Sequence, residues 1–542
     1  MYILGINGGF RQGYQDISAV LLKDGQLLAA IEEERLNRIK HSAGKLPYLA
    51  IHELLKIAQI SMHQIDVVAF HGSTWNGNFN EQLVSYFNNQ FGYCPTIKRY
   101  HHHDCHAISA FCASNFEEAL IFSYDGSGDG ISFQVSIGKN NTLKTIYRAE
   151  RPNSLGFFYS MMTQYCGFVK DSDEYKLMGL SSYGNRHAYD FSWLINVENG
   201  ELKLNQDFLI TITQGQPSAH RDEMLFNQQF LEKMGKPRRI PNAEMENFYQ
   251  DVAASAQQHF EDCLLKLVQF YSTQTGIKNI CLVGGSALNC VANQKIMNAD
   301  FVEKLYVQPA SSDSGISLGS AWLTAIDANQ KPIAPKHTFL GNSYTDKEIE
   351  HVLQASKVSY TKLENPALKA AQLISENKVI GWFQGKMEFG PRALGNRSIL
   401  ANPTHADIQK IVNEKIKFRE SFRPFCPSIL EEDVAQYFIG KQKIAPYMTI
   451  TYEATPFAQQ HIPSVIHVDN SARIQTVNKD QNALFYALLQ HLKSINGHGV
   501  VLNTSFNLSH EPIVCTPRDA LATFYSSGLD ALIIGNFLVE KS

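Results

Sequence analysis

Residues 18–32, Ser-Ala-Val-Leu-Leu-Lys-Asp-Gly-Gln-Leu-Leu-Ala-Ala-Ile-Glu, form two apolar runs separated by Lys23-Asp24-Gly25. An Asp-Gly pair between apolar runs is a strong β-hairpin signal, because these residues accept the backbone conformation of a tight turn. Another apolar run, Tyr2–Asn7, lies before this hairpin. The chain is therefore predicted to open with three sequential strands.

Further elements follow this predicted meander. A helix is expected from about Leu46 to Ala58, with Pro47 near its first turn, where proline is favoured. The apolar segments Ile65–His71 and Ala119–Tyr124 are predicted to be buried strands. Strands, a helix and further strands in this order predict an α/β fold, in which a mixed sheet carries helices on its faces.

The middle of the chain predicts a long helix and a ligand-binding turn. Within about Met245–Tyr271, apolar residues recur every four positions, which lines one face of a helix. Strand Ile280–Val283 follows, then Gly284-Gly285, then a helix expected from Ala287. A glycine pair between a strand and a helix is typical of a turn that lets a ligand approach the backbone closely.

The sequence predicts two domains. Its 542 residues provide enough chain for several domain-sized units. Pro332 and Pro335 lie in a polar stretch without periodicity, which places a boundary at about 328–345. We therefore expect one domain at 1–330 and a second at 345–542. Residues 186–240 are polar and weakly patterned, so no element is assigned to them.

The composition favours a globular, cytoplasmic protein. Lys and Arg total 48 and Asp and Glu total 52, which gives a net charge of −4. This balance disfavours binding to nucleic acid or to a membrane surface. No apolar run reaches the length of a transmembrane helix. The nine cysteines are scattered and form no Cys-x-x-Cys pair, so neither a disulfide framework nor a cysteine zinc site is supported.

Four histidines occur within the seven residues Tyr100–His106. His102 and His106 are four positions apart, and on a helix this spacing places both imidazoles on one face, within reach of one metal ion. Residues 107–114 are predicted to continue this helix. A solvated histidine patch at a helix start is the alternative.

Two acidic turns could complete such a metal site. A strand at 121–124 leads into an Asp/Gly-rich turn at 125–130, which would expose backbone N–H groups and place Asp125 at the strand end. A second turn, 309–315, carries Asp313. Two imidazoles and two carboxylates suit Fe²⁺, Mn²⁺ or Zn²⁺. Ordinary hairpin chemistry is the alternative for an Asp-Gly turn.

A basic island lies in the second predicted domain. Between Lys386 and Arg423 there are eight basic and four acidic residues, in a chain whose net charge is negative. Gly, Pro and Phe are interleaved with the positive residues, which favours bidentate anion recognition over a solvated charge run. Nucleic acid is the other interpretation, but the island is short and has no groove-reading motif.

Two later segments are predicted to line a pocket. Residues 468–475 supply Arg473, and the apolar strand that begins at Val500 ends in hydroxyl and amide side chains at 503–507. Open α/β sheets usually bind their ligands at strand ends.

Together these motifs resemble the O-carbamoyltransferase family typified by NodU, the cephalosporin carbamoyltransferase and the tobramycin carbamoyltransferase. The resemblance covers almost the whole chain, and its most specific segment is Glu388-Phe-Gly-Pro-Arg-Ala-Leu-Gly-Asn-Arg-Ser398. The other matching segments are Glu33–Arg35 with Lys40-His41, the His102/His106 pair, Asp125-Gly126, Asp173–Leu180, Gly284–Asn289, Asp313–Gly315, Phe422–Phe425 and Asn503–Asn507.

The resemblance implies a fold and a reaction. The first domain would be TsaD-like, an actin/heat-shock-ATPase/sugar-kinase type fold of two related α/β halves, and the second would be a YrdC-like α/β domain. The second domain would form carbamoyl-adenylate from carbamoyl phosphate and ATP, with Mg²⁺ accompanying ATP. The first domain would transfer the carbamoyl group to a hydroxyl of a small natural product, and AMP would leave.

The resemblance also implies the site residues. Those of the adenylate-forming site are Arg392, Lys417, Arg423, Arg473 and Ser505. Their positive charges would stabilise phosphoryl oxygens and the departing pyrophosphate. The implied ligands of a Lewis-acid metal, with Fe²⁺ ahead of Mn²⁺ or Zn²⁺, are His102, His106, Asp125 and Asp313. The residues that would cradle the adenosine phosphate are Asp125, Gly126, Gly284, Gly285 and Asn289.

One departure from the family pattern concerns the general base. The family commonly has a histidine before the acidic residue of its first hairpin, where this chain has Gln15 before Asp16. An amide does not accept a proton near neutral pH, so the task is predicted to move to Asp16, unless the acceptor differs or is more acidic. Three further residues match family motifs: Lys40, Glu174 and Lys176. Each is predicted either to contact the acceptor or adenylate, or to belong to a surface ion pair.

Two alternative functions are a threonylcarbamoyl-type tRNA modification enzyme, which uses the same two domain types, and a non-catalytic nucleotide-binding protein of the same fold. The fused second domain and the lack of a basic tRNA surface favour a small molecule. The expected partner is a small acceptor with a hydroxyl group, without nucleic acid or membrane. Formation of a homodimer is left open.

Overall fold

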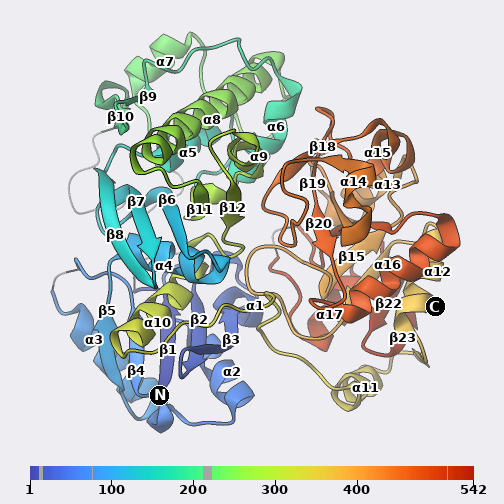
Figure 1. Cartoon of the computed structure of the whole chain (residues 1–542). Coiled ribbons are helices and arrows are strands. Elements are labelled where there is room, and N and C mark those ends of the chain that lie inside the picture. The colour runs from blue at the N-terminus through green and yellow to red at the C-terminus, as the bar shows by residue number, and fades with distance from the viewer. Residues whose placement is uncertain (11–15, 76, 211–222, 421, 510, 542) are drawn as a thin grey trace. The chain divides into compact units, whose positions relative to one another are not determined.

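The computed structural model describes residues 1–10, 16–75, 77–210, 223–420, 422–509 and 511–541. The chain divides into two compact units (Figure 1). The first unit holds Met1–Glu33 and His41–Ala334, and the second holds Glu34–Lys40 and Pro335–Ser542. The short segment Glu34–Lys40 therefore belongs with the C-terminal part of the chain, which no sequence pattern indicated.

The first unit contains two five-stranded sheets built to one plan. Their strand orders are β3-β2-β1-β4-β5 and β8-β7-β6-β11-β12. In each sheet the central strand, β1 or β6, pairs antiparallel with the strand that follows it and parallel with a later strand. This repetition confirms the predicted fold of two related α/β halves, the actin/heat-shock-ATPase/sugar-kinase type.

The first sheet contains the predicted meander. Strands β2 and β3 pair antiparallel from Ser18↔Glu32 to Lys23↔Gln26, so the turn is Asp24-Gly25, as predicted. The strands of this sheet are β1 (Tyr2–Asn7), β2 (Ser18–Lys23), β3 (Gln26–Glu32), β4 (Val67–Phe70) and β5 (Thr96–Arg99). Those of the second sheet are β6 (Glu118–Gly128), β7 (Ile131–Lys139), β8 (Thr142–Glu150), β11 (Asn279–Val283) and β12 (Lys304–Val307).

Two helices occupy the space between these sheets. Helix α10 (Ile316–Asp327) packs on β1 and on α4 (His102–Ser114), and α4 in turn packs on β6 and β11 (Figure 1). Both helices are mostly buried, and α4 is the helix predicted from the histidine spacing. The start of α4 therefore meets the second sheet, and the segment that leads into α10 comes close to both.

The remaining helices cover the outside of the first unit. Helix α8 (Asn247–Thr275) is the predicted long helix, and its regularly spaced apolar residues are buried against α5, α6 and α9. A two-stranded sheet joins β9 (Ile195–Glu198) and β10 (Glu201–Leu204). The other helices are α2 (Tyr48–Ala58), α3 (Phe79–Phe91), α5 (Leu155–Tyr165), α6 (Glu174–Leu180), α7 (Gln228–Met234) and α9 (Cys290–Asn298).

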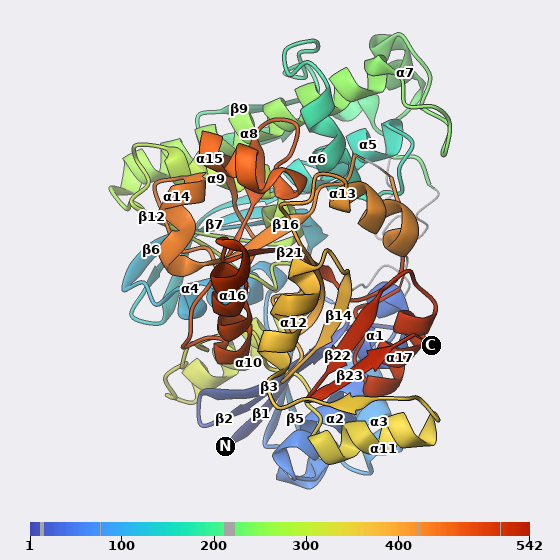
Figure 2. The same ribbon diagram turned by 90° about the vertical axis from the view of Figure 1, so that its right-hand side faces the viewer.

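The second unit is the predicted α/β domain, built on an eight-stranded mixed sheet of order β13-β23-β22-β14-β15-β21-β16-β20. Helices α12 (Pro366–Ser375) and α16 (Ala483–Asn496) lie side by side on this sheet (Figure 2). Their apolar faces and the sheet form one core around the buried Trp382.

The strands of that sheet are β13 (Thr361–Lys362), β14 (Ile380–Phe383), β15 (Arg397–Ala401), β16 (Cys426–Leu430), β20 (Gln475–Val477), β21 (Val500–Ser505), β22 (Ala531–Ile534) and β23 (Phe537–Glu540). A smaller sheet joins β17 (Phe438–Ile439), β18 (Thr451–Ala454) and β19 (Ser471–Arg473). The other helices are α1 (Glu33–Asn37), α11 (Asp346–Ala355), α13 (Ile408–Ile411), α14 (Val434–Tyr437), α15 (Pro456–His461) and α17 (Pro517–Tyr525).

Within the described ranges, no helix combines the length and the apolar character that crossing a lipid bilayer requires.

Candidate functional site

Four side chains singled out in the sequence come together in the first unit. His102 and His106 stand in the first turns of α4, Asp125 lies on β6, and Asp313 begins a single 3-10 turn before α10. One ligand atom from each of the four lies within 4.8 Å of all the others. His102 Nε2 is 2.8 Å from Asp125 Oδ2, and His106 Nε2 is 3.5 Å from a carboxylate oxygen of each aspartate.

The local structure explains why the histidines face this point. Asp129 Oδ2 accepts a hydrogen bond from the backbone N–H of His102 at 2.9 Å, which satisfies one of the open donors at the helix start. Gly128 leaves room for the His102 ring, since a Cβ at this position would lie 2.1 Å from a ring carbon. From there, the four-residue spacing brings His106 to the same face.

The course of β6 corrects one expectation. The turn does not begin at Asp125, because β6 continues through Gly128 and the turn is confined to Asp129-Gly130. Asp125 therefore projects from a strand, and its backbone carbonyl accepts a hydrogen bond from Ser154 Oγ at 2.7 Å. Gly126 also lies on this strand, where a Cβ would meet no other atom within 4 Å.

The electrostatics of the cluster keep the Asp125 carboxylate ionised. Burial disfavours the imidazolium of His102, but the hydrogen bond to Asp125 and the charges of Asp125 and Asp313 outweigh burial and raise the pKa of His102 to about 9. Burial alone would raise the pKa of Asp125, yet the neighbouring His103 and His102 hold it well below its usual range. Ionised carboxylates are the form that binds a metal cation.

The donor set fits a divalent transition metal. His106 Nε2 and Asp125 Oδ1 are buried and make no hydrogen bond to any described residue. Leaving such groups unsatisfied costs about 1–3 kcal/mol each, which a bound cation would offset. Two imidazoles and two carboxylates suit Fe²⁺, Mn²⁺ or Zn²⁺. The Asp313 side chain is 36% exposed while the other three are buried, so the cluster opens to solvent beside Asp313.

Two buried histidines beside the cluster were not identified from the sequence. His103 contacts Ser123 Oγ through Nδ1 at 2.7 Å and the Ile131 carbonyl through Nε2 at 3.0 Å, and burial lowers its pKa to about 3. His71 follows β4, and its ring centroid lies 5.6 Å from that of His102. Burial holds the pKa of His71 well below its usual value. A single histidine at the end of a predicted strand carries no recognisable signal.

The glycine pair and Asn289 have structural roles of their own. Gly284 has φ +95°, and a Cβ there would lie 2.2 Å from the Tyr124 carbonyl oxygen, so close packing alone requires glycine. Asn289 accepts a hydrogen bond from the Ala292 N–H at the start of α9 and exchanges two bonds of 3.0 Å with Gln257. A Cβ on Gly285 would meet nothing within 4 Å. The adenosine-phosphate role of these residues stays a prediction.

Asp16 lies two residues before β2, the first strand of the hairpin. Its Oδ1 is 2.7 Å from His41 Nδ1, and its backbone N–H donates to the His41 carbonyl at 3.1 Å. Two residues further on, Ser18 Oγ donates to the carbonyl of Ser314, the residue after Asp313, at 2.7 Å. Gln15, whose identity motivated the prediction for Asp16, lies outside the described residues.

The other motif residues of the N-terminal part lie in different surroundings. Lys40 is exposed and belongs to the second unit. Lys176 Nζ is 3.2 Å from Asp173 Oδ2, an ion pair at the start of α6. Glu174 Oε1 accepts hydrogen bonds of 2.7 Å from Ser160 Oγ and from the Asp171 N–H, and burial raises its pKa to about 7.

The second unit gathers positive charge around Lys417. This lysine is buried at the end of a π-helical turn, Val412–Lys417, and its Nζ donates to the Asn507 carbonyl at 2.9 Å and to Asn507 Oδ1 at 2.8 Å. Ser505 Oγ lies 3.5 Å from the same amine. Burial lowers the pKa of Lys417 well below its usual value, and the charges of Arg419 and Arg423 lower it further.

Asn413 forms hydrogen bonds with two arginines of this positive region. Arg419 Nε donates to Asn413 Oδ1 at 2.6 Å, and Asn413 Nδ2 donates to the Arg423 carbonyl at 3.3 Å. Arg423 also lies 3.5 Å from Glu420 Oε2. We refer to Lys417, Arg419 and Arg423 as the cationic cluster. The predicted pair Lys417 and Ser505 is therefore brought together, although the two are far apart in the sequence.

The remaining predicted arginines stand on other elements of the second unit. Arg473 ends β19, and its Nε and Nη2 lie 3.1 and 3.0 Å from Cys426 Sγ. Arg392 stands on the loop between β14 and β15. Glu388 shapes this loop, since its Oε1 accepts the backbone N–H groups of Leu394, Asn396 and Arg397 at 2.8–3.2 Å.

Arg397, in the family motif at 388–398, has a structural role. Its guanidinium is buried, donates to the carbonyl oxygens of Gln384 and Gly385, and lies 3.7 Å from the ring centroid of Phe383. This arginine therefore holds the loop in place rather than facing a ligand. Only an arginine can make this set of hydrogen bonds, because lysine has no planar group with several N–H donors.

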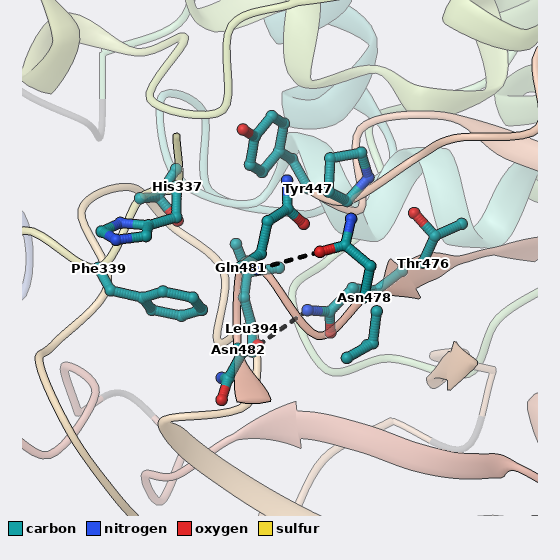
Figure 3. A pocket seen from close by; sticks show the side chains of 12 residues that line it. His337, Phe339, Leu394, Tyr447, Thr476, Asn478, Gln481 and Asn482 are labelled. Carbon is teal, nitrogen blue, oxygen red and sulfur yellow. Dashed lines mark hydrogen bonds between the residues drawn. The ribbon is translucent and has the colours of Figure 1, made fainter. Parts of the chain in front are cut away.

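A small pocket of the second unit is shown in Figure 3. His337, Leu394 and Tyr447 are among its lining residues, together with amide side chains such as that of Asn478. Its free space is about 10 Å³, about the room that one water molecule needs. In this conformation the pocket is too small for a nucleotide.

Comparison with known proteins identifies the family. The family model described as "Carbamoyltransferase N-terminus" matches residues 78–322, and "Carbamoyltransferase C-terminus" matches residues 371–541. An uncharacterized protein of Synechocystis sp. is 34% identical, over 100% of this chain and 97% of its own length. The chain belongs to the carbamoyltransferase family. The resemblance found in the sequence is thereby confirmed, and so is carbamoyl transfer as the reaction of this enzyme.

This carbamoyltransferase is also similar to a second sequence relative and, more weakly, to a solved structure. Nodulation protein NolNO of Sinorhizobium fredii is 33% identical, over 100% of this chain and 83% of its own length. The crystal structure of full-length HypF in the phosphate- and nucleotide-bound form has a TM-score of 0.34 at 13% identity, covering 61% of this chain and 47% of that chain. At that score, the likeness to HypF supports no conclusion about site or mechanism.

Proposed function

We propose that this carbamoyltransferase works in two steps, one in each unit. In the second unit, with Mg²⁺ present, water would cleave the P–O bond of carbamoyl phosphate, so that phosphate leaves and carbamate remains. A carbamate oxygen would then form a bond to the α-phosphorus of ATP, which gives carbamoyl-adenylate as pyrophosphate leaves. In the first unit, a hydroxyl oxygen of a small natural product attacks the carbamoyl carbon. The bond between that carbon and the adenylate oxygen breaks, and AMP leaves.

The observation that carries this proposal is the cationic cluster. Burial and two neighbouring guanidinium groups both disfavour the charged form of Lys417. An anionic ligand would offset this repulsion, and both carbamoyl phosphate and ATP are anions. Perturbed charges of this kind concentrate at functional sites. Positive charge fixed at Lys417 and Arg423 would stabilise the departing pyrophosphate.

Three further residues complete the proposed adenylate-forming site. Arg392 and Arg473 would bind phosphoryl oxygens through their planar guanidinium groups, which match phosphate geometry. Ser505 lies beside the Lys417 amine and would add a polar contact. For Arg392, the loop that Glu388 holds in shape provides the rigid support that such positioning needs.

In the first unit, the metal cluster marks the proposed transfer site. His102, His106, Asp125 and Asp313 would hold Fe²⁺, or Mn²⁺ or Zn²⁺ in its place. A metal ion bound there would supply a Lewis acid for a carbonyl oxygen. The open side of Gly285 would let the adenylate phosphate approach the backbone.

Product analysis tests the proposal. The purified chain is incubated with ATP, Mg²⁺, carbamoyl phosphate and a panel of hydroxyl-bearing sugars and antibiotics, and products are followed by mass spectrometry. We expect one acceptor to gain the mass of one carbamoyl group, together with release of pyrophosphate and AMP. Pyrophosphate release with threonine and bicarbonate, but not with carbamoyl phosphate, would instead support the tRNA-modification alternative and exclude the proposal.

A further inference from the structure

We propose that His41, held by Asp16, is the general base that takes the proton from the acceptor hydroxyl in the first unit. This inference rests on the proposed two-step function and adds the residue that activates the acceptor.

The pair has the geometry of a base with an orienting carboxylate. His41 Nδ1 lies 2.7 Å from Asp16 Oδ1, and a backbone hydrogen bond of 3.1 Å joins the same two residues. An ionised carboxylate only accepts hydrogen bonds, so Nδ1 carries the hydrogen and Nε2 carries the lone pair. The side chains of His41 and Asp16 are 19% and 27% exposed. His41 Nε2 itself is buried in this conformation, so a hydroxyl would have to enter beside the ring to reach it.

The backbone at both residues is unusual. His41 has φ 63° and ψ −14°, and Asp16 has φ 52°. Residues other than glycine adopt this left-handed region uncommonly, and such conformations cluster at active sites, where surrounding structure stabilises them. Two such residues facing each other indicate that the chain is held in place to form this contact.

The repeated fold places the pair at a site equivalent to the metal cluster. The connection from β1 to β2 in the first half corresponds to that from β6 to β7 in the second, because each joins the central strand to its antiparallel neighbour. Asp125, bonded to His102, lies on β6 four residues before the turn that leads to β7, and Asp16, bonded to His41, lies two residues before β2. Each half thus presents one carboxylate–imidazole pair at the same end of its sheet.

A direct contact joins these two places. Ser18 Oγ donates to the Ser314 carbonyl at 2.7 Å, and Ser18 and Ser314 are close neighbours of Asp16 and Asp313, respectively. Asp313 is the most exposed of the four metal-site residues. An acceptor that enters beside Asp313 would therefore enter next to the Ser18–Ser314 contact, two residues along the chain from Asp16.

The proposed step balances atoms and charge. His41 Nε2 takes the proton of the acceptor hydroxyl, while the oxygen forms a bond to the carbamoyl carbon. The bond from that carbon to the adenylate oxygen breaks, and AMP keeps its electron pair. The imidazolium, stabilised by Asp16, then releases its proton to solvent.

The test uses His41→Ala and Asp16→Asn in the full chain, with methanol as the probe acceptor. ATP, Mg²⁺ and carbamoyl phosphate are supplied, and pyrophosphate, AMP and methyl carbamate are measured. We expect His41→Ala to keep pyrophosphate release. Transfer of the carbamoyl group to methanol or water, measured as AMP release, should be about 10²-fold slower. Added imidazole should restore a large part of this rate, because it replaces the missing base. Asp16→Asn should be slower by about 10-fold and should not respond to imidazole.

An exposed histidine of the same unit serves as the matched control. His63→Ala should release AMP at the wild-type rate with and without imidazole. The proposal is overturned if His41→Ala releases AMP as fast as the wild type, or if imidazole restores nothing while pyrophosphate release is normal. Failure of the two-step function itself looks different, because the wild type would then release no pyrophosphate from ATP and carbamoyl phosphate.

Discussion

The two units differ in the sign of the charge that they bury. The first unit collects two carboxylates with two imidazoles around one point. The second holds Arg419 and Arg423 on Asn413, and their charges act on the nearby Lys417 amine. The second unit leaves like charges close together, which an anionic ligand would relieve. The first unit leaves His106 Nε2 and Asp125 Oδ1 buried without a hydrogen bond to any described residue. Under the proposed function, a cation would bind in the first unit and anionic phosphates in the second, so one chain would separate activation from transfer.

The largest effect is expected from Arg423→Ala, which removes one charge of the cationic cluster. If activation occurs there, pyrophosphate release and carbamoyl transfer should both fall by about 10²–10³-fold, as for loss of one charge-stabilising donor. Pyrophosphate and carbamoylated product are measured in the same reaction. Arg518→Ala, at an exposed arginine of the same unit, is the control and should change neither rate. Unchanged pyrophosphate release in Arg423→Ala would remove activation from this unit.

His106→Ala should slow carbamoyl transfer but not pyrophosphate release. It removes one donor of the metal cluster, so transfer should fall by about 10²-fold, since metal ions supply several kcal/mol of charge stabilisation. Pyrophosphate release in the second unit should stay within about twofold of the wild type. The exposed His187 provides the control His187→Ala. Equal loss of both activities in His106→Ala would show that the two steps share one site.

Gly128→Ala tests the geometry of the metal cluster without removing a donor. The added Cβ would meet the His102 ring at 2.1–2.3 Å and displace it. We expect Fe²⁺ affinity, measured by competition with a chelator, to fall by about 10–100-fold, as for changes that misorient a metal ligand. Gly126→Ala is the matched control for metal affinity, because its Cβ would meet no atom within 4 Å. The same affinity in both variants would contradict the proposed role of His102 as a ligand.

The smallest effect concerns stability and Glu174. Burial raises the pKa of this carboxyl from 4.5 to about 7, so the unfolded chain ionises it first as pH rises. Stability is therefore lost between about pH 4.5 and 7, and the penalty is complete above pH 7. Glu174→Gln removes the ionisable group and keeps an oxygen for Ser160 and Asp171. Its melting temperature should match the wild type near pH 4 and exceed it by a few degrees at pH 8.

An exposed carboxyl of the same unit provides the comparison for this measurement. Glu117→Gln should have the same melting temperature as the wild type at both pH values. A gain for Glu174→Gln that is equal at pH 4 and pH 8 would show that ionisation of Glu174 does not limit stability.

Much of the fold could be predicted because its signals are local. The hairpin at Asp24-Gly25, the long helix α8 and the helical spacing of His102 and His106 all depend on neighbours within a few residues. Patterns of this range are encoded directly in turn chemistry and in the 3.6-residue helical period. The family resemblance added the remaining candidate residues, which spacing alone could not connect.

Other features depended on contacts between distant segments. The sequence indicated a turn at Asp125, but pairing with β7 carries β6 through to Gly128. Asn289, which the family resemblance implied as a ligand contact, also bonds to Gln257 and to the start of α9, contacts that its sequence position did not indicate. His71 carried no signal, and His41 entered only as part of a family motif without a role, because their contacts arise only where other segments meet them.

The amino-acid sequence by itself determined which chemistry this protein has available: imidazoles on one helical face, carboxylates at strand ends, and a glycine-bearing run of arginines. Only the tertiary structure decided which of these groups face one another. Spacing along a helix or strand sets directions over a few residues, but the approach of Asp313 to His106, or of His41 to Asp16, depends on how whole sheets and helices pack.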